Sequence, residues 1–273
     1  MSYLDKLFDI KNKVAVITGG GGVFAGKMAE GLIKAGAIVI LIVRDLKKVE
    51  QRVAALNQFG TAISLACDVL DKENLQKVCD TIVNKFGSID ILINAAGGNM
   101  PGATIAQEGS LFEMDMESFQ KVVNLNLNGS VLPSMVFGEV MAKQKAGSII
   151  NISSMAAEQV ITRVAGYSAS KAAIANFTKW MAVEMAQKFG EGIKVNALAP
   201  GFFIGHQNRK LLTNEDGSLT KRGQDIIRNT PMGRFGEADE LIGATLYLCS
   251  NAAKFVTGIV LPVDGGFSAF SGV

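Results

Sequence analysis

The sequence predicts one α/β domain built on a doubly wound parallel sheet of about seven strands, with helices on both faces. Short β-branched runs alternate with helical stretches along most of the chain, which is the pattern of a buried parallel sheet. The first such run leads into a glycine-rich turn and then a helix. The length of 273 residues and the 48% hydrophobic composition suit a single large core. We therefore expect residues 1–273 to form one domain.

Composition excludes several classes of partner. A net charge of +2 is too small to indicate binding to nucleic acid or to an anionic membrane. Cys67, Cys79 and Cys249 are widely spaced and lack metal-ligand spacing, so we interpret them as buried thiols of a reducing compartment. The first residues lack the apolar core of a signal peptide, and the most apolar run, 35–43, is too short to cross a bilayer. We expect a cytoplasmic protein with a small-molecule substrate and no metal.

The first strand is predicted at residues 13–18, and a run of four glycines follows it. A helical stretch then continues to about Ala35. Glycines allow a backbone to approach a pyrophosphate closely, and the start of a helix offers N–H groups and the positive end of its dipole. This context predicts dinucleotide binding, with Gly19, Gly22 and Phe24 among the residues in contact.

The second strand is predicted at residues 38–43 and ends at Arg44 and Asp45. An acidic residue at this place accepts hydrogen bonds from the ribose 2′-hydroxyl of NAD, whereas an arginine can pair with the 2′-phosphate of NADP. Arg44 therefore favours NADP, and Asp45 leaves NAD open. The alternative is that both side chains are solvated loop charges.

Further elements follow in the same alternation. We expect an amphipathic helix at 51–59, a third strand at 63–69 that includes Asp68 and Val69, and a fourth strand at 89–94. From the residues alone, Asp68 would cap the next helix. Small residues directly after the fourth strand, 95–97, leave room for a cofactor.

Residues 119–141 are predicted to form one long helix. Within it, Asn124, Asn126 and Asn128 alternate with leucines. Asparagine is disfavoured in the middle of a helix because its side chain competes for backbone hydrogen bonds. The pattern therefore needs a reason, which is either catalysis or an amide that caps a break in the helix.

The segment from Ser154 to Lys171 carries the most specific chemistry. An apolar strand at 147–153 ends at Ser154, and Tyr167 follows thirteen residues later at the start of a helix that continues to Gly190. Lys171 lies four residues beyond Tyr167, so both side chains share one helix face. A neighbouring cation favours the phenolate and lowers the pKa of tyrosine from about 10 towards a useful range. A chance Tyr-x-x-x-Lys match is the alternative.

The last third of the chain predicts a strand at 193–199 and a turn at Pro200 and Gly201. The following segment, 202–228, is long, polar and interrupted by glycines, which is typical of a mobile lid. It contains the single histidine, His206, which we interpret as solvated or in contact with substrate. A last strand within 255–266 precedes an apolar tail, whose composition suggests burial against another subunit.

In order and spacing, these motifs resemble those of the short-chain dehydrogenase/reductase family from Lys13 to the C-terminus. The resemblance implies a Rossmann-type domain that transfers a hydride between a nicotinamide and a substrate. It implies that Tyr167 donates the proton and that Ser154 hydrogen-bonds the carbonyl oxygen. Lys171 would lower the tyrosine pKa and hold the nicotinamide ribose, and Asn126 would hold a water that relays protons.

The resemblance also implies a cofactor contact set. Asp68 and Val69 would hold the adenine, Asn94 would brace neighbouring strands, and the turn after the sixth strand would face the nicotinamide. Departures from the family pattern are Val23 and Ala25 in place of glycines, Ala95 in place of asparagine and Gly205 in place of threonine. The complete predicted set is Gly19, Gly22, Phe24, Arg44, Asp45, Asp68, Val69, Asn94, Ala95, Gly97, Tyr167, Lys171, Pro200 and Gly201.

Segments 200–212, 214–217, 230–236 and 265–273 look like the D-mannonate oxidoreductase (fructuronate reductase) branch of this family. That similarity implies interconversion of D-fructuronate and D-mannonate by a homotetramer. A sugar-acid carboxylate is suited to a guanidinium clamp. The predicted substrate set is Asn99, Ser154, Arg163, Tyr167, Asn208 and Arg209, with Arg209 and Arg163 as rival clamps.

Three other interpretations remain open at this point. One is a member of the same family that acts on another polyol or keto-acid, such as gluconate at C5. Another is a dinucleotide-sensing protein without catalysis, since a fold does not determine function. The third is a structural scaffold, which has no use for Asn126, Ser154, Tyr167 and Lys171 together.

Overall fold

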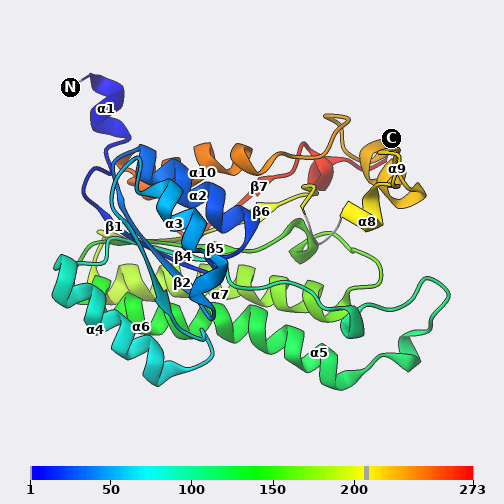
Figure 1. The fold of residues 1–273 in the computed structure, drawn as a ribbon, viewed down its shortest axis with the longest axis horizontal. Coiled ribbons are helices and arrows are strands. Elements are labelled where there is room, and N and C mark those ends of the chain that lie inside the picture. Colours follow the sequence, from blue (N-terminus) through cyan, green and yellow to red (C-terminus); the bar gives the residue numbers. More distant parts are fainter. Residues whose placement is uncertain (1, 206–208, 273) are drawn as a thin grey trace.

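A computed structural model describes residues 2–205 and 209–272, and these ranges form one α/β domain (Figure 1). Its sheet has seven parallel strands in the order β3-β2-β1-β4-β5-β6-β7, which confirms the predicted fold class. The direction of strand succession reverses between β1 and β4, and ligands of such sheets bind at the carboxyl ends beside this reversal. The strands are β1 Val14–Thr18, β2 Ile38–Val43, β3 Ala62–Ala66, β4 Ile91–Asn94, β5 Gly147–Ile152, β6 Ile193–Pro200 and β7 Val260–Val263.

Helices cover both faces of the sheet. Figure 1 shows α2, α3 and α10 on one face and α4, α6 and α7 on the other. Successive strand residues alternate between the two layers, so Ala15 and Ile17 pack in one core cluster while Val14 and Val16 pack in the other. The helices are α1 Tyr3–Leu7, α2 Val23–Lys34, α3 Glu50–Leu56, α4 Lys72–Phe86, α5 Met116–Val123, α6 Gly129–Gln144, α7 Ala165–Phe189, α8 Arg209–Leu212, α9 Lys221–Arg228 and α10 Leu241–Cys249.

The predicted long helix at 119–141 is not regular. α5 and α6 are joined by a π-helical turn at Asn124–Asn128, which contains all three alternating asparagines. Pro133 lies in the first turns of α6, where it has no N–H to donate to the carbonyl of Gly129. A single-turn π-bulge inside an α-helix is frequently found at a functional site. The prediction of one continuous α-helix was therefore wrong at the asparagines.

Two other predicted boundaries need correction. β3 ends at Ala66, so Asp68 and Val69 lie beyond the strand rather than within it. The cap of α4 is Asp71, which accepts a hydrogen bond from the amide of Asn74 at 2.9 Å, whereas Asp68 accepts one from the amide of Leu70 at 3.0 Å. The interpretation of Asp68 as the helix cap was wrong, because the chain makes a turn before the helix begins.

The segment after β6 and the C-terminal tail lie close together (Figure 1). The ring of Phe267 in the tail meets the ring of Phe202 edge-to-face at 5.2 Å, and Gln159 donates to the carbonyl of Ser268 at 3.0 Å. Phe270 remains 37% exposed. The tail thus packs partly on its own chain, and its burial against another subunit stays a prediction. Within residues 2–205 and 209–272, no helix combines the length and apolar character needed to span a membrane.

Candidate active site

The glycine turn after β1 is locked against the segment that follows β4. Gly19 has φ +65°, and a Cβ at this position would lie 2.7 Å from the Cα of Ala96. Only glycine combines this backbone conformation with so close an approach. The hydroxyl of Thr18 also accepts hydrogen bonds from the amides of Ala95 and Ala96, at 3.1 and 3.2 Å. Two small-residue loops therefore meet at the carboxyl edge of the sheet.

The start of α2 explains both departures from the glycine pattern. Gly22 is the N-cap, and Val23 is the first helical residue with a side chain 39% exposed, so nothing at this position requires glycine. Ala25 is 2% exposed and packs in the core, where a small side chain is sufficient. The ring of Phe24 meets Phe203 edge-to-face at 5.2 Å. The loop keeps its shape without the two expected glycines.

This loop fits a pyrophosphate. Within the part of the chain that the structure describes, the amides of Val23 and Phe24 have no hydrogen-bond acceptor, whereas the amide of Gly22 donates to Gly19 at 2.8 Å. Unpaired N–H groups at the start of a helix, together with the positive end of the helix dipole, form an anion-binding position. The residues present therefore suit the phosphates of a dinucleotide.

Arg44 and Asp45 are both exposed at the end of β2. The carboxylate of Asp45 accepts a hydrogen bond from the amide of Lys47 at 3.1 Å, which caps a short 3₁₀ turn. No carboxylate lies within ion-pairing distance of Arg44 among the described residues. The guanidinium is thus the freer of the two groups, which is consistent with the expectation that position 44 contacts the adenosine ribose or its phosphate.

Asn94 ties three elements together. Its Nδ2 donates to Ser134 Oγ of α6 and to Asn151 Oδ1 of β5, each at 2.8 Å, and its side chain is 1% exposed. The bonds therefore brace β4 against its neighbours. Asp68 is half-buried and Val69 is 6% exposed directly after β3, at the same edge of the sheet.

The predicted catalytic side chains converge at the ends of β5 and α7. Ser154 follows β5 and is 8% exposed, while Lys171 is 4% exposed. The Lys171 ammonium donates to the carbonyl of Ile152 at 2.7 Å and lies 5.5 Å from the centre of the Tyr167 ring. Ser153 Oγ donates to the carbonyl of Lys171 at 3.2 Å, which fastens the helix to the end of the strand. Backbone contacts thus hold the lysine in place.

Asn126 joins this group from the π-turn. It is fully buried, its Nδ2 donates to the carbonyls of Gly98 and Val122 at 2.7 and 2.8 Å, and its Oδ1 accepts from the amide of Gly98 at 3.1 Å. A Cβ at Gly97 would lie 2.6 Å from Asn126 Oδ1 and 3.5 Å from Lys171 Nζ. Gly97 therefore runs between the two side chains. Both amide hydrogens of Asn126 are used, so the second lone pair of Oδ1 is the side-chain position left for a water.

Burial sets the protonation of the central pair. It raises the pKa of Tyr167, and a hydrogen bond with Ser154 opposes that rise. Burial also lowers the pKa of Lys171 to about 8. The expected lowering of the tyrosine pKa is thus reversed, because burial of the phenol outweighs its hydrogen bond with Ser154. A protonated phenol at neutral pH is suited to donate a proton rather than to accept one.

Two half-buried arginines, Arg163 and Arg222, lie close enough for their charges to interact. Arg163 has φ +75°, and its Nε donates to the carbonyl of Ile105 at 2.6 Å. Arg222 on α9 is half-buried, and burial together with the charge of Arg163 lowers its pKa. The sequence prediction missed Arg222, and its only signal was a cationic Lys-Arg pair within the predicted lid.

The other predicted substrate residues are either exposed or outside the described ranges. Arg209 is exposed at the first position of α8. Within the described ranges, no carboxylate lies close enough to form an ion pair with Arg163, Arg209 or Arg222. Asn99 is exposed and donates to Thr104 Oγ1 at 2.7 Å. Asn208 and His206 lie outside the described residues.

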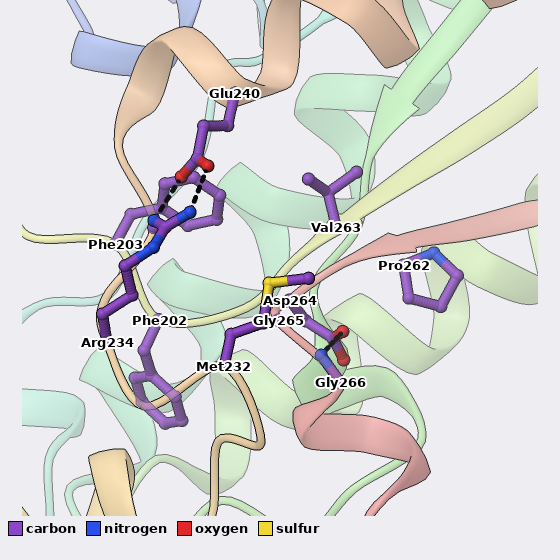
Figure 2. Close-up of a pocket in the computed structure, with 11 residues that line it drawn as sticks. Phe202, Phe203, Met232, Arg234, Glu240, Pro262, Val263, Asp264, Gly265 and Gly266 are labelled. Atoms are coloured by element: carbon purple, nitrogen blue, oxygen red, sulfur yellow. Dashed lines mark hydrogen bonds and ion pairs between the residues drawn. The ribbon is translucent and has the colours of Figure 1, made fainter.

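A pocket of about 400 Å³ lies beside the turn that follows β6 (Figure 2). A Cβ at Gly201 would be 2.6 Å from the Cβ of Asp264, so glycine allows this turn to approach the pocket wall. The charged groups that line it are satisfied internally: Arg234 pairs with Glu240 at 2.6 Å, and Asp264 accepts from the amide of Gly266 at 2.9 Å. It contains none of the four predicted catalytic side chains. We therefore do not assign the chemistry to it.

Metal chemistry has no ligand cluster to use in this part of the chain. Over residues 2–205 and 209–272, no three His, Cys, Asp or Glu side chains gather in a group that could hold an ion. Cys67, Cys79 and Cys249 are buried free thiols, and burial raises the pKa of each of them. Inert thiols of this kind are packing residues.

Comparison with known proteins identifies relatives over nearly the whole chain. A family profile described as enoyl-(acyl carrier protein) reductase matches residues 22–268. An uncharacterized oxidoreductase of Bacillus subtilis, UxuB, is 45% identical over 275 residues, which cover 97% of this chain and 98% of that protein.

Solved structures give the same result. One, described as a candidate D-mannonate oxidoreductase from Haemophilus influenzae with bound NAD, superposes with a TM-score of 0.90 at 42% identity. The match covers 97% of this chain and 98% of that one. A gluconate 5-dehydrogenase from Burkholderia cenocepacia, in complex with NADP and tartrate, matches with a TM-score of 0.84 at 30% identity over 98% and 99% of the two chains.

Proposed function

Since the chain belongs to the short-chain dehydrogenase/reductase family and is an NAD(P)-dependent oxidoreductase acting on alcohol groups, we propose that it interconverts a sugar-acid ketone and its alcohol. D-fructuronate and D-mannonate are the proposed pair. The observation that carries this choice is the half-buried pair Arg163 and Arg222, which lacks a carboxylate partner in the described ranges. The 42% identical structure from Haemophilus influenzae supports it.

In the direction of reduction, the chain supplies a proton and a hydrogen bond to the ketone oxygen. A bound nicotinamide dinucleotide supplies the hydride. Tyr167 gives its phenolic proton to the ketone oxygen, and its raised pKa keeps that proton in place at neutral pH. The hydroxyl of Ser154 accepts from the amide of Ala156 at 3.1 Å and is hydrogen-bonded to the Tyr167 phenol. When substrate is bound, the Ser154 hydrogen turns from the phenol to the ketone oxygen.

Lys171 and Asn126 restore the proton that Tyr167 donates. The ammonium of Lys171 holds ribose hydroxyls and returns a proton to Tyr167 after each turnover. One of its hydrogens already binds the carbonyl of Ile152, which leaves two for these tasks. Asn126 Oδ1 holds the relay water beside Gly97.

The arginines select the substrate. The charges of the half-buried Arg163 and Arg222 repel each other. A substrate carboxylate bound to both would remove that repulsion and accept charge-assisted hydrogen bonds. We assign the substrate lid to segment 202–228, to which Arg209 and Arg222 belong. Asn99 and Asn208 complete the proposed substrate set as hydrogen-bonding partners for hydroxyl groups.

We assign the cofactor preference to Arg44 and therefore lean to NADP, although the related structures named above carry NAD in one case and NADP in the other. A homotetramer is part of the same proposal. It is supported by apolar side chains on the outer faces of α6 and α7, where Met135 and Trp180 are 52% and 58% exposed. Cytoplasmic localisation is supported by three buried thiols that remain free.

Turnover of D-fructuronate with NADH and NADPH side by side tests the proposal. A 5-keto-gluconate and a neutral ketose serve as competing substrates. We expect the highest kcat/KM for fructuronate with NADPH and a much lower value for the neutral ketose. Preference for the keto-gluconate would move the enzyme to the gluconate 5-dehydrogenase type. Binding of a dinucleotide without turnover of any of these substrates would favour a sensing protein.

A further inference from the structure

The guanidinium of Arg52 lies directly against the glycine turn. Arg52 is on α3, and its Nη1 donates to the carbonyls of Gly20 and Gly22, the latter at 3.0 Å. It is half-buried, and burial lowers its pKa. No carboxylate lies within ion-pairing distance of it among residues 2–205 and 209–272. The two loop carbonyls are therefore the partners that the structure gives to this buried cation.

These hydrogen bonds fix the direction of two peptide planes. A trans peptide points its N–H opposite to its carbonyl. Arg52 holds the carbonyls of Gly20 and Gly22, so it also sets the direction of the N–H groups of Gly21 and Val23. The amide of Val23 is one of the unpaired donors at the start of α2. A side chain from outside the loop thus determines where the anion-binding donors lie.

The glycine at position 26 of α2 is a second observation that points to the Arg52 contact. It occupies the middle of the first turns of α2, where glycine is destabilising relative to alanine. A Cβ at this position would lie 2.6 Å from Cζ and 2.8 Å from Nε of Arg52. Glycine is thus the residue that leaves room for the guanidinium over the helix start.

We propose that Arg52 is a positioning residue for the cofactor: it clamps the glycine turn in the shape that receives the pyrophosphate, and Gly26 exists to admit it. In this loop Val23 and Ala25 replace two glycines of the family pattern. The Arg52 clamp therefore stabilises a turn that has fewer glycines than the family motif. The inference rests on dinucleotide binding alone and is independent of the substrate.

A double-mutant cycle tests the clamp. We expect Arg52→Met to raise the dissociation constants of NADH and NADPH by the same factor, about tenfold, because two charge-assisted hydrogen bonds to the loop are lost. kcat at saturating cofactor should stay within about twofold, since the catalytic side chains are untouched. Arg52→Lys should recover part of the affinity. Lys48→Met removes an exposed cation from the neighbouring turn and serves as the matched control, with affinity unchanged.

The second arm adds Gly26→Ala and measures cofactor affinity together with the Tm of the apo protein. Gly26→Ala in the wild-type background should weaken binding of both cofactors, because the new Cβ displaces the guanidinium. In the Arg52→Met background the same change should be neutral for affinity and should raise Tm by about 2–4 °C through helix propensity. Additive effects of the two substitutions would overturn the proposal. Unchanged affinity in Arg52→Met would also overturn it, as would a loss confined to NADPH, which would make Arg52 a 2′-phosphate ligand instead.

Discussion

The proposed catalytic group and the proposed substrate lid are built in opposite ways. Asn126, Ser154 and Lys171 are each at most 8% exposed, and bonds to the backbone of other elements hold Asn126 and Lys171 in place. In the lid segment 202–228, two short helices carry Arg209 and Arg222, for which the described residues provide no ion-pair partner. Under the proposed function, the difference means that the reaction type is fixed before substrate arrives, whereas the choice of substrate depends on charges that the substrate carboxylate would neutralise.

The largest expected effect tests the fixed half. Tyr167→Phe removes the proton donor, and we expect kcat to fall by about two to four decades, the usual contribution of a positioned acid. The phenol bonds only Ser154 in the described structure, so the fold and the dissociation constant of the cofactor should be retained. Steady-state kinetics with a parallel cofactor titration measure both. Turnover near the wild-type rate would assign the acid elsewhere.

The next effect tests the arginines proposed to bind the substrate carboxylate. Arg163→Ala and Arg222→Ala should each raise KM for fructuronate by about one to two decades, since a carboxylate would lose a charged, partly buried hydrogen-bond pair worth roughly 1.5–3 kcal/mol. Arg209→Ala should have a smaller effect, because an exposed charge is screened by water.

A neutral ketose is the control for these three variants, and its KM should not change. The sequence placed Arg209 first and Arg163 second. A large rise in KM for Arg209→Ala, with Arg222→Ala unaffected, would restore that order and would dissolve the proposed pair.

Much of the fixed half could be predicted from the sequence, because its geometry is local. A helix places Tyr167 and Lys171 on one face at a spacing of four residues, and the end of β5 brings Ser154 to them. The π-turn at Asn124–Asn128 could not be predicted in the same way, since it depends on how Asn126 bonds to Gly98 from a distant loop.

The remaining failures share one physical cause. The direction of the tyrosine pKa depends on burial, which no spacing rule reports. Arg222 and Arg52 gain their roles from contacts between elements that are far apart in the sequence. Which arginines become half-buried is decided by packing between distant segments, and local sequence does not distinguish them from exposed arginines.

The pH dependence offers a smaller test of the fixed half. Lys171 has a pKa lowered to about 8 by burial, so it is charged below that pH and loses its proton as the pH rises through it. We expect kcat/KM for reduction to fall above about pH 8, by up to roughly tenfold per pH unit, because the ribose and the relay lose the ammonium. Binding of NADH should weaken over the same range. In Lys171→Met the residual cofactor affinity should not fall above pH 8. If the fall persisted in this variant, another group would be responsible for it.

Arg44 is an exposed charge that, like Arg209 and Arg222, has no ion-pair partner among the described residues. Its proposed partner is the 2′-phosphate of the cofactor. Arg44→Ala should raise the dissociation constant of NADPH by about three- to tenfold and leave that of NADH nearly unchanged, because only NADPH has a 2′-phosphate. Fluorescence titration with each cofactor measures this. Equal losses would make Arg44 a bystander, and a wild type that prefers NADH would shift the role to Asp45.

The smallest effect asks which half Arg163 belongs to. Its φ of +75° is unfavourable for any residue with a Cβ, whereas glycine adopts it without strain. Arg163→Gly and Arg163→Ala both remove the guanidinium and its bond to Ile105, so their KM values should agree. Urea denaturation should nevertheless find the glycine variant more stable by about 1 kcal/mol, because only the alanine variant keeps the strained backbone. Equal stabilities would mean that the backbone at 163 relaxes when the side chain is lost. Arg163 would then resemble the lid, which adapts to substrate, rather than the fixed catalytic group.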